Sequence, residues 1–118
     1  MKHFKISEFA CNCGCKRADM YQPFLIAIDG LRGELGFPFV ISSGFRCVKH
    51  NEAVGGAGGS LHMRGMAADV LCDARQAYQI LSASPRWGFT GIGISQKGDG
   101  KRFVHLDNRS GPAVMWSY

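Results

Sequence analysis

The feature that most constrains the fold and chemistry of this 118-residue chain is a set of two imidazoles and one carboxylate, those of His62, His105 and Asp69. A catalytic zinc site usually takes three nitrogen or oxygen ligands from the protein and leaves a fourth position for water. Gly65 favours a bend between the first two residues, so we expect His62 on a loop and Asp69 in the apolar run 66–71, which is typical of a buried strand. A carboxylate inside such a run is costly unless it is paired or bound to a metal.

The third residue lies in segment 103–107, where Phe103, His105 and Asp107 alternate with apolar residues and therefore share one face of a strand. If this strand lies next to 66–71, it brings His105 beside Asp69. The spacing alone still favours the plainer alternative, because a single histidine is more often a surface or hydrogen-bonded residue than a metal ligand.

Several separated motifs follow one another in a fixed order along the chain. They are Ile41-Ser-Ser-Gly-Phe-Arg46, His50-Asn51, Val54-Gly-Gly56, Ser60-x-His62-x-x-Gly65-x-Ala67-Ala68-Asp69, Gly91-Ile-Gly93 and Phe103-Val-His105-Leu-Asp107. Together they closely resemble the D-alanyl-D-alanine carboxypeptidase family of zinc peptidases, a family grouped by its site with lysostaphin-type peptidases and hedgehog domains. The resemblance covers nearly the whole chain and is strongest to short bacterial and phage-borne members. It implies an α+β fold, with a small antiparallel sheet and flanking helices.

The resemblance also implies roles for individual residues. His62, Asp69 and His105 match the Zn²⁺ ligands of the family, and Ser60 matches a serine that commonly precedes the first ligand by two residues. Arg46 matches an arginine that binds substrate or stabilises developing negative charge, which suits its planar, forked guanidinium group. Without the family, a surface ion pair would be the preferred interpretation of Arg46.

The general base is the point where this chain departs from the family. Many relatives carry a histidine two residues before the last ligand or an acidic residue three before it, and here those positions are Phe103 and Arg102. We prefer Asp107, which either orients a ligand imidazole or accepts a proton from water on the metal. Asp99, in a glycine-rich turn, and His50 are the alternatives.

The resemblance implies zinc-dependent hydrolysis of an amide bond in peptidoglycan stem or cross-link peptides, by a carboxypeptidase or an endopeptidase such as a phage endolysin. The alternative function is a non-catalytic, zinc-containing module that binds the cell wall or serves as a structural component of a phage virion.

Composition is compatible with both functions. The length predicts a single domain over residues 1–118, and we expect a monomer. Fourteen Lys and Arg against nine Asp and Glu give a net charge of +5, which favours polyanionic partners. Because the basic residues are scattered and form no RNA-binding or zinc-finger motif, we do not expect nucleic-acid binding.

No segment contains the roughly 20 apolar residues that span a bilayer, and the N-terminus lacks the apolar core of a signal peptide. We therefore expect synthesis in the cytoplasm and action at the cell wall after release or as part of a virion. A cytoplasmic enzyme that recycles wall peptides is also open.

The five cysteines form a Cys11-x-Cys13-x-Cys15 cluster, with Cys47 and Cys72 further on. An odd count without a signal peptide predicts reduced thiols rather than a complete disulfide framework. The cluster is a candidate for a structural zinc site completed by Cys47 or Cys72. The alternatives are incidental thiols or one disulfide, since alternating cysteines differ from the usual spacing of zinc ligands.

Periodicity and capping residues predict the remaining elements. They are a helix whose apolar stripe runs from Phe24 to Leu35 and ends at Gly36, a strand over 39–42, a short helix over 49–54, a glycine-rich loop over 55–59, a helix from the N-cap Asp73 to about Ser84, and antiparallel strands over 90–95 and 102–108 joined by a turn at 98–100.

Overall fold

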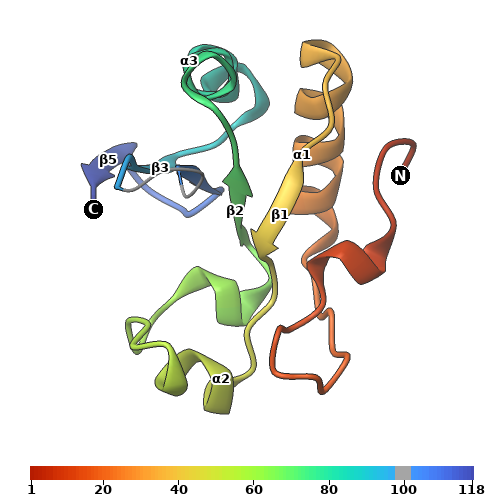
Figure 1. Ribbon diagram of the computed structural model, residues 1–118, viewed down its shortest axis with the longest axis vertical. Coiled ribbons are helices and arrows are strands. Elements are labelled where there is room, and N and C mark those ends of the chain that lie inside the picture. The colour runs from red at the N-terminus through yellow and green to blue at the C-terminus, as the bar shows by residue number, and fades with distance from the viewer. Residues whose placement is uncertain (98–101) are drawn as a thin grey trace.

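The computed structural model describes residues 1–97 and 102–118, and in these residues one five-stranded sheet organises the fold (Figure 1). Its strand order is β1-β2-β4-β3-β5. The strands are β1 (Val40–Ser43), β2 (Ala67–Leu71), β3 (Gly91–Ser95), β4 (Phe103–Asp107) and β5 (Val114–Ser117). The first four strands pair antiparallel, whereas β5 pairs parallel with β3. The sheet is therefore mixed. The expected turn at 98–100, with Asp99, lies outside the described residues.

Helices α1 (Gln22–Leu35) and α3 (Ala74–Ala83) contribute the apolar side chains that cover one face of this sheet. Because side chains alternate along a strand, the even-numbered residues of β2 and β4 point to this face and the odd-numbered ones point away from it. The buried core joins both helices to the even-numbered residues Ala68, Val70, Val104 and Leu106. Asp69, His105 and Asp107 therefore lie on the opposite face.

Shorter elements complete the chain. Helix α2 (Val48–Ala53) follows β1, and single 3₁₀ turns occur at η1 (Ile6–Phe9), η2 (Leu61–Arg64) and η3 (Ser84–Trp87). In Figure 1, α2 and the segment that leads from it to β2 lie below the sheet, far from α3. The segment from α2 to β2 carries the glycine-rich loop and His62, and Arg46 lies in the turn between β1 and α2. Together they close one side of the odd-numbered face.

The predicted α+β class is confirmed, and so are the helical stripe from Phe24 to Leu35 and the end of that helix at Gly36, whose φ is +76°. Two predictions need correction. His62 lies on η2 rather than on an irregular loop, because Ser60 caps the turn and the left-handed Gly65 ends it. The sheet also contains β5, which the sequence did not predict and which makes it mixed rather than wholly antiparallel.

The N-terminus of α3 offers a test of local stability. Asp73 accepts a hydrogen bond from the backbone N–H of Gln76 at 2.8 Å, and the Gln76 side chain accepts one from the N–H of Asp73 at 3.0 Å. We expect Asp73→Ala to lower the free energy of unfolding by about 1 kcal/mol, because the substitution removes this capping box. Urea denaturation measures the change. Arg75→Ala, on the exposed surface of the same helix, is the control, and equal midpoints for the two variants would contradict the prediction.

Candidate active site

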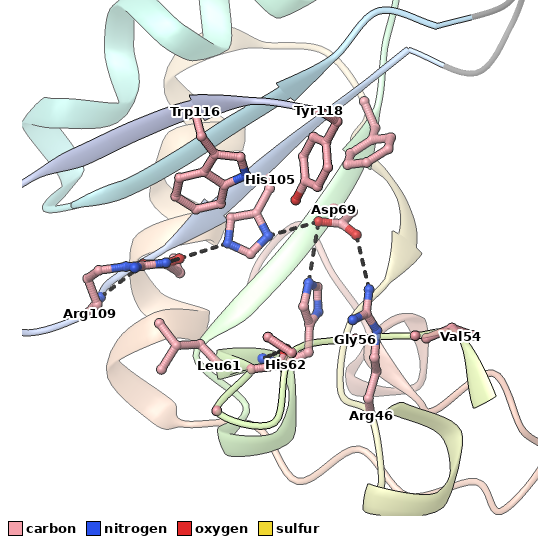
Figure 2. A pocket seen from close by; sticks show the side chains of 16 residues that line it. Arg46, Val54, Gly56, Leu61, His62, Asp69, His105, Arg109, Trp116 and Tyr118 are labelled. Carbon is pink, nitrogen blue, oxygen red and sulfur yellow. Dashed lines mark hydrogen bonds and ion pairs between the residues drawn. The ribbon is translucent and has the colours of Figure 1, made fainter. Parts of the chain in front are cut away.

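The register of β2 and β4 places Asp69 directly opposite His105, as the sequence predicted. The Nδ1 atom of His105 lies 3.1 Å from Oδ1 of Asp69. From η2, Nε2 of His62 approaches the same oxygen to 3.4 Å (Figure 2). All three side chains are buried, and their potential ligand atoms lie within 4.8 Å of one another. The three predicted ligands thus converge on one point.

Hydrogen bonds fix the orientation of the His62 ring. Its Nδ1 lies 2.8 Å from the carbonyl oxygen of Gly44, which can only accept, so Nδ1 carries the proton. The lone pair of Nε2 therefore faces Asp69. The local turn depends on Gly65, whose φ is +67° and where a Cβ would collide with the backbone of Asp19 and Met20.

The His105 ring is oriented from its other side by Asp107. Nε2 of His105 donates to Oδ2 of Asp107 at 2.7 Å, which leaves Nδ1 facing Asp69. Arg109 holds the fully buried Asp107 carboxylate through Nε at 2.9 Å, Nη2 at 2.7 Å and its backbone N–H at 3.2 Å. The arrangement matches metal sites in which a carboxylate fixes the tautomer of a ligand histidine.

Charge is concentrated in this buried group. Burial raises the pKa of Asp69, but the neighbouring imidazoles of His105 and His62 outweigh it and lower the pKa to about 2. Burial also raises the pKa of Asp107, yet Arg109 and His105 hold it well below its usual range. Burial lowers the pKa of His105, whereas Asp107 and Asp69 raise it above its usual value. Two imidazole nitrogens beside an ionised carboxylate form a donor set that suits Zn²⁺.

Arg46 borders this group on the side of the glycine-rich loop. Its Nη2 lies 3.5 Å from Oδ2 of Asp69, its Nε donates to Ser43 at 3.0 Å, and its Nη1 donates to Asn51 at 3.4 Å. Asn51 is itself buried and donates to the carbonyl oxygen of Ala57 at 2.9 Å. The guanidinium group is therefore held in place beside Asp69 and is not a mobile surface cation.

A pocket of about 670 Å³ opens over these residues. Among the residues that line it are Arg46, Ser60, Asp107 and the three predicted ligands, whereas His50 is not among them. The lining also includes Phe103, Trp116 of the unpredicted strand β5, and Tyr118, which directly follows that strand. In Figure 2, Trp116 and Tyr118 lie on one side of His105 and Asp69, with His62 and Arg46 on the other. Their spacing of two residues, which places both on one face of an extended segment, was the only signal that pointed to them, and it does not show which strand the segment joins.

The glycines of the Gly91-Ile-Gly93 motif make room for this site. Gly91 pairs with Asp107 across β3 and β4, and a Cβ at position 91 would collide with the Asp107 carboxyl group. A Cβ at Gly93 would likewise collide with the Trp116 indole. The motif therefore has a steric cause, since the Asp107 carboxylate and the indole occupy the space of the missing side chains.

We expect Gly91→Ala to displace the Asp107 carboxylate and so release the His105 ring. Loss of such an orienting partner weakens metal binding by about 10- to 100-fold. Competition with a chromophoric chelator measures the zinc affinity of the folded variant. Gly58→Ala is the matched control, because a Cβ at that glycine meets nothing within 4 Å. Equal zinc affinities for the two variants would count against this role of Gly91.

A family model described as Peptidase M15 matches residues 2–107, which include every ligand candidate and Arg46. A search of curated proteins found no match. Of the helices in the described residues, none combines the length and the apolar character needed to cross a bilayer.

Proposed function

The chain belongs to the M15 peptidase family, and from this premise we propose that it is a zinc-dependent peptidase that hydrolyses an amide bond in peptidoglycan stem or cross-link peptides. The observation that carries the proposal is the convergence of His62, Asp69 and His105, with ligand atoms within 4.8 Å of one another. Each imidazole directs one nitrogen to this point and commits the other to an oxygen acceptor.

Zinc held by these three residues would supply a Lewis acid for the scissile carbonyl and would lower the pKa of a water molecule. The chain itself supplies the positioning. Asp107 holds His105 in one tautomer and is a positioning residue in this proposal, because both of its oxygens already accept hydrogen bonds from Arg109 and His105. Arg109 keeps Asp107 ionised and in place.

Arg46 would stabilise negative charge on the substrate. Its forked guanidinium group lies beside Asp69 and lines the pocket, where a substrate carboxylate or the oxyanion that forms at the scissile carbonyl can accept its hydrogen bonds. Across the pocket, burial raises the pKa of Tyr118, so its hydroxyl stays protonated near neutral pH and can donate a hydrogen bond.

Peptidoglycan suits this pocket chemically. Stem peptides carry carboxylates, which complement Arg46 and the net charge of +5. The aromatic side chains of Phe103, Trp116 and Tyr118 offer apolar surface along the same pocket for the backbone and methyl groups of the peptide. We further propose that the protein reaches the wall after release from the cell or as a virion component.

The test is to incubate the zinc-loaded protein with purified peptidoglycan and to identify the released fragments by mass spectrometry. We expect fragments that share one cleaved amide bond, and the mass of these fragments identifies that bond. A chelator should stop their release, and added zinc should restore it.

His62→Ala should release no fragments, whereas His3→Ala, which replaces an exposed histidine outside the pocket, should match the wild type. Release by His62→Ala at the wild-type rate would overturn the proposal. Zinc-loaded protein that binds the wall without cleaving it would instead support the non-catalytic module.

A further inference from the structure

A second group of potential metal ligands lies at the N-terminal side of the molecule. Cys11, Cys13 and Cys15 come from the segment after η1, and Cys47 caps the N-terminus of α2. Their sulfur atoms lie within 4.8 Å of one another, although Cys15 and Cys47 are more than thirty positions apart in the chain. Cys72, the other candidate partner, is not part of this group.

The sulfur separations match those of a tetrahedral metal site. Zn²⁺ binds thiolates at about 2.3 Å, so two sulfurs of a regular tetrahedron lie about 3.8 Å apart. The sulfurs of Cys11, Cys13 and Cys47 are separated by 3.4, 3.7 and 3.8 Å. A disulfide would need about 2.05 Å, and all five cysteines, which the structure describes in full, are free.

The backbone around the cluster is arranged to accept alternating cysteines. The N–H of Cys11 donates to the carbonyl oxygen of Arg17 at 2.7 Å, which closes the segment into a loop. Within it, Gly14 and Lys16 adopt left-handed conformations, with φ of 90° and 64°. Left-handed residues allow the chain to turn tightly. In an extended strand the three alternating cysteines would point to one side but would lie further apart, whereas this turn brings them together.

Two backbone donors point at the sulfurs. The N–H of Cys47 donates to the sulfur of Cys11 at 3.5 Å, and the N–H of His50 donates to the sulfur of Cys47 at 3.4 Å. Such donors favour thiolate over thiol.

The short distances between the sulfurs favour a cation at their centre. The sulfurs of Cys11, Cys13 and Cys47 lie 3.4 to 3.8 Å apart, so thiolates at these positions would repel one another. A divalent cation bound between them removes this repulsion.

We propose that Cys11, Cys13, Cys15 and Cys47 bind a structural Zn²⁺ ion that ties the N-terminal segment to the loop carrying Arg46. Each thiol releases its proton to solvent and forms one zinc–sulfur bond, so no oxidant or reductant takes part. The two segments already meet at the Phe45 N–H, which donates to the Phe9 carbonyl at 2.8 Å, and at the Asn12 side chain, which donates to the Ser42 carbonyl at 2.8 Å. Because Cys47 directly follows Arg46, the ion would restrain the residue that borders the pocket.

The proposal does not depend on peptidase activity and is tested by counting metal ions in the purified full chain. We expect two zinc ions per chain in the wild type and in Cys72→Ala, the matched thiol control. His62→Ala and Cys13→Ser should each hold one zinc ion. The first variant loses the ion of the His62, Asp69 and His105 site, and the second loses the ion of the cysteine site. Equal zinc content in Cys13→Ser and the wild type would overturn the proposal.

Cobalt loading of His62→Ala gives a readout that needs no cysteine variant. We expect an intense sulfur-to-cobalt charge-transfer band, because thiolates are then the ligands of the metal, whereas imidazole and carboxylate ligands give none. Absence of the band, or a disulfide among the four cysteines detected by peptide mapping of non-reduced protein, would also overturn the proposal.

Discussion

Asp69→Asn is expected to reduce peptidoglycan cleavage more than about 100-fold, because even residues that only orient a ligand contribute about 10- to 100-fold in metal affinity or activity. The amide has nearly the shape of the carboxylate but lacks its charge. It therefore keeps an oxygen beside His105 and His62, while the attraction for a divalent cation is lost. The zinc content of the His62, Asp69 and His105 site should fall together with the activity.

Metal analysis and a fragment-release assay on the same preparation measure both effects. Asp73→Asn is the matched control, because Asn caps a helix about as well as Asp and position 73 lies outside the pocket. If Asp69→Asn kept its zinc and stayed within about tenfold of the control in activity, Asp69 would not be a ligand.

Arg46→Ala is expected to lower kcat by about 10²- to 10³-fold, the usual effect of removing one donor to a developing oxyanion. Zinc should remain bound, because Arg46 contacts Asp69 from outside the ligand set. Arg46→Lys should restore only part of the rate, since Lys keeps the charge but lacks the planar fork that reaches Ser43, Asn51 and Asp69 together.

Steady-state kinetics on a soluble stem peptide separate kcat from KM in these variants. Arg64→Ala, an exposed arginine outside the pocket, should behave as the wild type. A rise in KM with an unchanged kcat would show that Arg46 only binds the substrate. Loss of zinc from Arg46→Ala would show that its contribution is structural.

The position of Asp69 beside His105 was predictable, because each residue lies on a strand that its local sequence pattern marks. The family resemblance, rather than the spacing, added His62 to this pair. Asp69 interrupts a short apolar run, and His105 shares a strand face with Asp107, so pairing of the two strands is enough to bring the residues together. The stripe of α1 and the cap at Asp73 were predictable because both depend on residues near one another in sequence.

Features that depend on distant parts of the chain, and that no local pattern marks, were not predictable. The β5 segment pairs parallel with β3, and its residues are mostly exposed, so it lacks a marked alternation of apolar and polar residues. The choice of Cys47 over Cys72 as the neighbour of the cysteine cluster depends on contact between β1 and η1. Neither arrangement follows from the spacing of residues along the chain.

Because Asp69 and His105 face each other across β2 and β4, metal affinity at this site would depend on the register of the two strands. A slip of one residue would turn Ala68 or Val70 toward the pocket and would bury the carboxylate among the apolar side chains of the helices. Only the correctly aligned chain offers the complete set of proposed ligands. A metal ion bound there would stabilise this form by about 2.7 kcal/mol at a free metal concentration 100 times Kd, and a misaligned form would gain nothing from this site. Binding of zinc would thus shift the folding equilibrium toward chains with the correct strand register.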